Sequence, residues 1–192
     1  MVDDTSSDAE IIAASLTDPD CFGLLFERHF PAVFSYSVRS IGVAEGEEIA
    51  SEVFVQAFSS RRRFDLTYRS ARPWLLGIAS NLVSTRYRSF ERRNRAYRRA
   101  LGRDSQTEEF ESEVADRVDA SSHSERARAA LAALRPPERT VVSLFVFGGL
   151  SYREIAEVLD LREGTVKSRL SRGRANLRNA LADIGEQWGN DE

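Results

Sequence analysis

The chain has few residues of the kinds that build disulfides, metal sites and membrane spans. Its 192 residues include one cysteine, Cys21, and two histidines, His29 and His123. This excludes an internal disulfide and argues against zinc sites and histidine-based catalysis. No segment approaches the ~18 uninterrupted apolar residues of a membrane-spanning helix, and the acidic start MVDDTSSDAE is unlike a signal peptide. We therefore expect a cytoplasmic protein with no membrane insertion, no catalytic residues, no metal and no cofactor.

Lysine is scarce as well, since Lys167 is the one lysine among 27 basic residues. The formal net charge of −3 hides a strong segregation of charge along the chain. Residues 86–103 contain eight arginines and one acidic residue, whereas residues 104–125 contain eight acidic residues and one arginine. Because local fields govern binding more than total charge does, the basic run over 86–99 fits the phosphates of duplex DNA, with a solvated helix end as the alternative.

Strand patterns are also rare, and apolar residues recur at helical spacing instead. A helix is expected over 19–41 and a second over 47–58. A third helix begins near Ser70, tolerates Pro73 in its first turn and ends as the arginine-rich run. Trp74 falls in register with the apolar positions of this third helix, so we expect it in the core.

The middle of the chain, residues 102–122, has few large apolar residues and no helical period, which predicts a flexible acidic linker. We therefore expect an all-α fold of two small helical domains that make few contacts with each other when the protein is free. The expected divisions are an N-terminal tail or short helix (1–19), a first domain (20–101), the linker (102–122), a second domain (123–184) and a C-terminal tail (185–192).

The segment 149–177 has the pattern of a helix-turn-helix. Ser151 and Glu154 form a capping box that predicts the start of one helix, and residues 160–162 supply a short turn before a second helix begins at Glu163. An amphipathic hairpin with solvated arginines is the alternative, but the cap, the turn length and the charged outer face together favour DNA binding. The outer side of the second helix carries Lys167, Ser168, Ser171, Arg172 and Arg174.

The two halves together resemble an extracytoplasmic-function (ECF) sigma factor of the sigma-70 family. EIASEVFVQAF resembles the family pattern D-L-x-Q-E-V-F-x-x-A-W, and RPWLLGIASNLVSTRYRSFERR resembles its W-L-x-x-I-A-x-N stretch. The second half resembles sigma region four from LRPPERTVV to RGRANL. The resemblance covers about residues 20–182, in the family's order. The chain departs from the family at four positions, which are Glu48, Ser51, Thr85 and Arg162.

The resemblance implies a bacterial protein that binds core RNA polymerase, recognises the −35 and −10 promoter elements and promotes DNA melting. The implied partners are promoter DNA, the beta and beta-prime subunits of core polymerase and, in many relatives, an anti-sigma factor. A helix-turn-helix regulator of response-regulator type is the alternative. That class requires a receiver domain with a parallel sheet, and the first half of the chain shows no strand pattern.

The resemblance also assigns residues to each task. Core binding falls on the polar face of the second helix, at Glu48, Ser51, Glu52 and Gln56. The −10 element would be read by the loop before the third helix and by a stripe on that helix, at Phe64, Asp65, Arg69, Ser70, Asn81, Thr85 and Arg88. The −35 element would be read at base edges by Lys167, Ser168, Ser171 and Arg172, with Arg169 and Arg174 nearer to phosphates.

Overall fold

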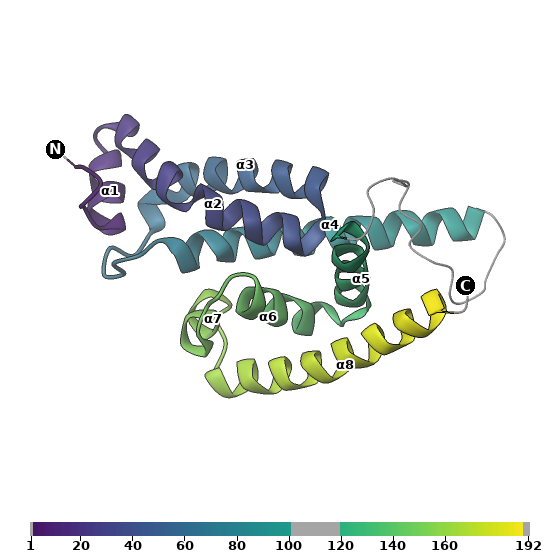
Figure 1. Cartoon of the computed structure of the whole chain (residues 1–192). Coiled ribbons are helices and arrows are strands. Elements are labelled where there is room, and N and C mark those ends of the chain that lie inside the picture. The colour runs from purple at the N-terminus through teal and green to yellow at the C-terminus, as the bar shows by residue number, and fades with distance from the viewer. Residues whose placement is uncertain (1, 101–119, 190–192) are drawn as a thin grey trace.

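Helices make up the fold. A computed structural model describes residues 2–100 and 120–189, and this part of the chain contains helices and no strand (Figure 1). The prediction of an all-α protein is thereby confirmed. The expected linker over 102–122 lies outside the described residues, except that residues 120–122 already belong to a helix. The elements are α1 (Asp8–Ser15), a 3₁₀ turn η1 (Pro19–Cys21), α2 (Phe22–Ile41), α3 (Val43–Ser60), a second 3₁₀ turn η2 (Arg61–Arg63), α4 (Arg72–Ala100), α5 (Ala120–Ala133), α6 (Pro136–Val146), α7 (Tyr152–Val158) and α8 (Glu163–Gly189).

The first unit is a bundle in which α2, α3 and α4 pack against one another, with α1 at one end (Figure 1). Leu25 of α2, Ile49 and Val53 of α3 and Leu75 of α4 are almost fully buried between them. Each helix buries one apolar side because its apolar residues recur every three or four positions. Trp74 is half-buried and packs against this core, as the sequence predicts.

The second unit consists of α5 to α8, with α5, α6 and α7 all packed against α8. Leu144 of α6, Ile155 of α7 and Leu170 of α8 are buried in its core. Gly173 allows α8 to lie close to α6, because a Cβ atom at this position would lie 2.6 Å from Cγ2 of Val142. The close contact fixes the direction of α8 relative to the rest of the unit.

The two units pack against each other, so the expectation of few mutual contacts is wrong for the described residues. Both α6 and α7 contact α4, and α5 contacts α2. At the start of α4, the Arg72 guanidinium donates a hydrogen bond to the carbonyl of Gly148 over 2.7 Å. Further along α4, the hydroxyl of Ser84 lies 3.3 Å from that of Thr140.

Arg139 brings a buried charge into this contact between the units, with 5% of the residue exposed. Its guanidinium lies 3.9 Å from the ring centre of Tyr87 and 3.4 Å from the Glu91 carboxylate, both on α4. A Cβ atom at Gly77 of α4 would lie 2.7 Å from Cγ1 of Val158, so the absence of a side chain there lets α7 approach. Two hydrogen bonds, the cation–π contact and ion pair of Arg139, and one close steric fit therefore hold the units together.

Candidate nucleic-acid interface

The helix-turn-helix forms as the sequence predicts. Ser151 Oγ accepts a hydrogen bond from the Glu154 N–H, and the Glu154 carboxylate accepts one from the Ser151 N–H, so the capping box is complete. Asp160 has a positive φ of 50°, which turns the chain after α7. The N–H groups of Thr165 and Val166 then donate to the Arg162 carbonyl, and α8 begins at Glu163.

The outer side of α8 presents a set of polar and basic side chains. Lys167, Ser168, Ser171 and Arg172 are exposed, while Val166 and Leu170 on the opposite side are buried. Four neighbouring hydrogen-bonding side chains on one face can contact base edges in a major groove. The helix therefore has the geometry of a recognition helix.

The two remaining predicted residues of α8 lie in different surroundings. Arg174 is exposed, and its guanidinium stacks over the ring of Phe145 at 4.9 Å. Arg169 is half-buried and lines a hollow of about 320 Å³ between the two units. Asn81 and Arg88 of α4 line the same hollow. The structure thus brings one residue of the predicted −35 surface next to two of the predicted −10 surface.

The predicted stripe on α4 is present on one side of that helix. Asn81, Thr85 and Arg88 are exposed, and the Arg88 guanidinium donates to the Thr85 hydroxyl over 3.0 Å. Thr85 and Arg88 also line a second hollow of about 360 Å³ together with Glu91, Arg92 and Arg95. The three guanidinium groups outnumber the one carboxylate, which pairs with Arg139, so the excess of positive charge suits phosphate.

The loop before α4 has exposed polar residues and one buried anchor. Asp65, Arg69 and Ser70 are exposed. Hydrogen bonds from the backbone and side chain of Thr67 lower the pKa of Asp65, so this carboxylate is charged at neutral pH. Phe64 is only 8% exposed, and its ring centre lies 5.1 Å from that of Trp74. Phe64 therefore anchors the loop in the core and offers little surface to a base.

The polar face of α3 is exposed along its whole length. Glu48, Ser51, Glu52 and Gln56 all face solvent, and the Gln56 amide donates to the Glu52 carboxylate over 3.1 Å. Glu48 is not free, because the Arg86 guanidinium of α4 pairs with it at 3.2 Å. Glu52 is thus the acidic residue of this face that has no basic partner among the described ion pairs.

Sequence reasoning missed two exposed apolar residues, one on this face of α3 and one on α2. Val55 is 65% exposed between Glu52 and Gln56, and Phe26 of α2 is 40% exposed with its ring centre 4.8 Å from that of Phe54. Exposed valine within a polar helix face is the sequence signal that could have found the first of them. Such residues are typical of protein-binding surfaces.

Two kinds of site have no candidate in the described part of the chain. Residues 2–100 and 120–189 contain no group of three or more histidine, cysteine or acidic side chains arranged to hold a metal ion. In the same ranges, no helix combines the length and the apolar character needed to cross a membrane.

Comparison with known proteins finds two family models that match parts of the chain. The model described as Sigma-70 region 2 matches residues 25–94, and the one described as Sigma-70, region 4 matches residues 124–177. The chain is 29% identical to the ECF RNA polymerase sigma factor SigL of Mycobacterium tuberculosis over 92% of this chain and 98% of the relative. It is 32% identical to the ECF RNA polymerase sigma factor SigW of Bacillus subtilis over 87% of this chain and 92% of the relative.

Solved structures with the same fold include two complexes. CnrH, solved with the cytosolic domain of CnrY, superposes with a TM-score of 0.63 at 26% identity, over 92% of this chain and 97% of that one. The sigma factor RpoE, solved with the anti-sigma factor NepR from Bartonella quintana, has a TM-score of 0.58 at 21% identity, over 84% and 96% of the two chains. At 21% identity, the similarity to RpoE indicates only that the two proteins share a fold. Helix α1 precedes the residues that either family model matches.

Proposed function

Because the chain belongs to the extracytoplasmic-function sigma factors of the sigma-70 family, we propose that its three exposed polar faces divide the work of promoter recognition. The protein is a sigma factor that binds core RNA polymerase and directs it to promoter DNA. The observation that carries this conclusion is the presence of both sigma regions on one chain, in order, each with an exposed polar face. The chain is a transcription initiation factor and contributes no catalytic step of its own.

The polar face of α3 is the proposed contact with core polymerase. Its carboxylates and amide suit a basic partner surface, and the exposed Val55 adds apolar area at its centre. Glu52 is the residue we expect to matter most, because Glu48 already pairs with Arg86. Ser51 and Gln56 flank it and complete the proposed surface.

The loop before α4 and the stripe on α4 are the proposed contacts with the −10 element. A base that leaves the duplex needs hydrogen bonds to its edge, which Asp65, Arg69 and Ser70 can make. Asn81, Thr85 and Arg88 then follow the strand along one side of α4. Phe64 serves this surface as the buried anchor of the loop.

The outer face of α8 is the proposed contact with the −35 element. In this proposal Lys167, Ser168, Ser171 and Arg172 contact bases and Arg174 contacts phosphate, and the exposure of all five side chains supports it. Arg169 is less exposed than these residues, and it lines the hollow between the units. We therefore assign Arg169 a phosphate contact in the promoter complex.

A response-regulator identity is not favoured, because residues 2–100 contain no strand from which a receiver sheet could form. We further propose that the protein acts in the cytoplasm, where polymerase and DNA are found. An anti-sigma factor stays a prediction from the family, and co-purification of a tagged chain from its own host would test it.

Transcription in a reconstituted system tests the proposed function. The purified chain and core polymerase should together give promoter-specific transcripts, with no other sigma factor present. A regulator would give none under these conditions. Glu52→Lys should abolish co-purification with core polymerase without changing the helix content measured by circular dichroism.

Asp20→Lys is the matched control for this substitution, because it makes the same change of charge at an exposed position in η1, away from α3. It should bind core polymerase as the wild type does. If Glu52→Lys and Asp20→Lys bind equally well, the polar face of α3 is not the core-binding surface.

A further inference from the structure

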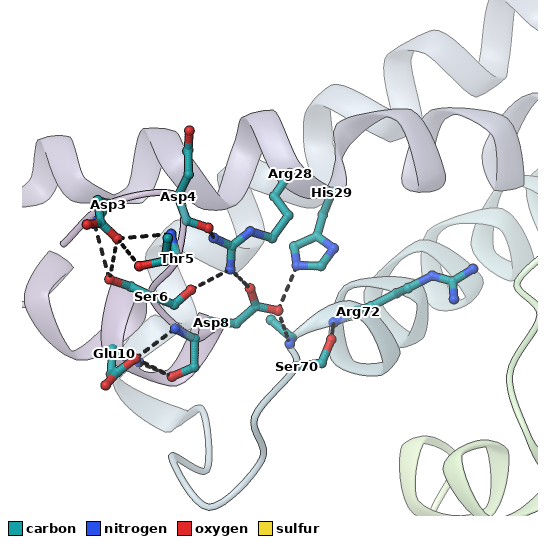
Figure 2. A network of polar contacts seen from close by, with 12 residues as sticks. Asp3, Asp4, Thr5, Ser6, Asp8, Glu10, Arg28, His29, Ser70 and Arg72 are labelled. Atoms are coloured by element: carbon teal, nitrogen blue, oxygen red, sulfur yellow. Dashed lines mark hydrogen bonds and ion pairs between the residues drawn. The ribbon is translucent and has the colours of Figure 1, made fainter.

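Helix α1 is held against α2 by a buried carboxylate. The residue Asp8 is 3% exposed, and its two oxygens face two donors from α2 (Figure 2). The Arg28 guanidinium donates to Oδ1 and His29 Nε2 donates to Oδ2, both over 2.7 Å. Arg28 also donates to the carbonyls of Asp4 and Ser6, over 2.9 and 2.8 Å. The N-terminal segment is thereby fixed on the first long helix.

The same carboxylate holds the far end of the loop that precedes α4. Asp8 Oδ2 accepts a hydrogen bond from the Ala71 N–H over 2.6 Å, and the Asp8 N–H donates to the Arg69 carbonyl over 3.3 Å. Ala71 is fully buried at the start of α4. Asp8 therefore binds the chain on both sides of Ser70, through one side-chain and one backbone hydrogen bond.

The other end of α1 lies at the near end of the same loop. The Arg61 guanidinium of η2 donates to the carbonyl of Ser15, the last residue of α1, over 3.4 Å. The loop leaves the bundle beside Ser15 and returns to it beside Asp8. Between these points its side chains are exposed from 65 to 70, so the two ends determine where those side chains lie.

We propose that Asp8 is a positioning residue for −10 recognition, which sets the place of Arg69 and Ser70 through its bonds to Ala71 and Arg69. The inference rests on the proposed function, because it takes the loop as a reader of the −10 element. It assigns a role to α1, a helix that lies outside both matched sigma regions. Asp8 acts through the loop and does not itself contact DNA.

Transcription by holoenzyme on two promoter libraries tests the proposal, one library varied at the −10 element and the other at the −35 element. With sigma factor in saturating amount, Asp8→Asn should lower the preference for the best −10 sequence about tenfold, because the loop loses its charge-assisted hydrogen bond to Asp8 and no longer holds Arg69 and Ser70 in one place. The −35 preference and the binding of core polymerase should stay unchanged. An equal loss on both libraries would make Asp8 a purely structural residue and overturn the proposal.

Asp4→Asn is the matched control, since it removes one negative charge from the same segment and the network uses only the backbone carbonyl of Asp4. It should keep both preferences. If Asp8→Asn does not fold, Arg28→Ala tests the same link, because it removes the donor to Asp8 Oδ1 and to the carbonyls of Asp4 and Ser6 and so loosens the segment on α2, while His29 and Ala71 keep their bonds to Asp8 Oδ2. Arg28→Ala should lower the −10 preference selectively but by less than tenfold, and an unchanged preference would overturn the proposal.

Variants of the loop separate this inference from the function on which it rests. If Arg69→Ala and Ser70→Ala leave the −10 preference unchanged, the loop does not read the −10 element and the proposed function of the loop fails. If they lower that preference while Asp8→Asn does not, the loop reads DNA without help from Asp8, and only the present inference fails.

Discussion

Asp8 is a buried carboxylate that stays ionised because three donors face it. Burial by itself raises the pKa of this carboxyl, but hydrogen bonds from His29, the Ala71 N–H and Arg28 outweigh burial and lower the pKa from 3.8 to about 2. Such a difference between the unfolded and folded pKa corresponds to roughly 2 kcal/mol of folding free energy at neutral pH.

The stability of the protein should therefore depend on Asp8 in a pH-dependent way. A lowered folded-state pKa stabilises the fold above the unfolded pKa of 3.8, and this stabilisation is lost as the pH falls toward the folded value of about 2. Asp8→Asn should cost roughly 2 kcal/mol at pH 7, and the cost should shrink on acidification from pH 5 toward pH 2. Urea unfolding of the wild type and of Asp8→Asn at several pH values measures this cost in unfolding free energy. An equal cost at pH 7 and pH 3 would contradict the conclusion that the Asp8 carboxylate is ionised in the folded protein.

Arg172 and Arg174 of α8 should contribute to DNA binding in different ways. Arg172→Ala should cost about 1–3 kcal/mol at the preferred −35 sequence and relax the preference at one base position, if its guanidinium contacts a base edge. Arg174, which stacks on Phe145, should contact only phosphate, so Arg174→Ala should weaken binding to every promoter alike and lower the salt slope by about one. Binding of holoenzyme to a −35 library at two salt concentrations tests both. A uniform loss for Arg172→Ala would make it a phosphate contact.

Two short helices depend on the same N-terminal capping motif. Both α1 and α7 begin with a complete capping box, at Ser7 with Glu10 and at Ser151 with Glu154. Each helix is too short to be stable alone, so its cap and its packing decide whether it forms. The first helix supports the loop before α4, and the second supports the recognition helix.

Removal of each cap should affect a different promoter element. Ser7→Ala and Ser151→Ala should each lower the free energy of unfolding by about 1 kcal/mol, because each leaves one backbone N–H, that of Glu10 or of Glu154, without its hydroxyl acceptor. Ser7→Ala should weaken discrimination at the −10 element and Ser151→Ala at the −35 element. Chemical denaturation together with the two promoter libraries measures this, and each variant is the control for the other. Identical effects on both libraries would show that the caps act on stability alone.

The sequence predicted what depends on neighbouring residues. The cap at Ser151, the turn at 160–162 and the exposed faces of α3 and α8 all follow from spacings of a few positions. The same S-x-x-E spacing stands at Ser7 and Glu10, where the capping box was missed. Asp8 could not be found in this way, because its partners His29 and Ala71 are 21 and 63 positions away. The burial of Phe64 could not be predicted for a related reason. The sequence pattern indicates that Trp74 belongs to the core of its own helix, but it does not indicate that Phe64 packs against it.

At the scale of the whole molecule, the contact between the units is the feature that no local pattern indicated. Arg72 and Arg139 each hold the second unit against the first, through the Gly148 carbonyl and through Tyr87 and Glu91. These contacts join the two units, which the acidic linker pattern predicts to be separate. Hydrogen bonds, a cation–π contact and the apolar packing of Gly77 against Val158 thus join the two units, as in an interface between domains.

The two units should therefore stay together after the chain is cut between them. Limited proteolysis is expected to cleave within 102–122, where the sequence predicts a flexible linker, and the two fragments should elute together in size-exclusion chromatography. Arg72→Ala combined with Arg139→Ala should separate them. Arg92→Ala combined with Arg95→Ala, two exposed arginines of the same α4, is the control and should leave the fragments associated. Separate elution of the wild-type fragments would contradict a stable contact.

The hollow shared by Arg169, Asn81 and Arg88 has a consequence for distances on DNA. The −35 and −10 elements are about 25 base pairs apart, or roughly 85 Å at a rise of 3.4 Å per base pair. If Arg169 contacts the −35 element and Asn81 and Arg88 contact the −10 element, as proposed above, side chains of one hollow have to reach sites this far apart, so the proposal requires the two units to separate by tens of ångströms on promoter DNA. About 20 residues of chain can extend to roughly 70 Å. The length of the acidic segment, which carries none of the predicted contacts, thus limits the spacing between promoter elements that this protein can accept.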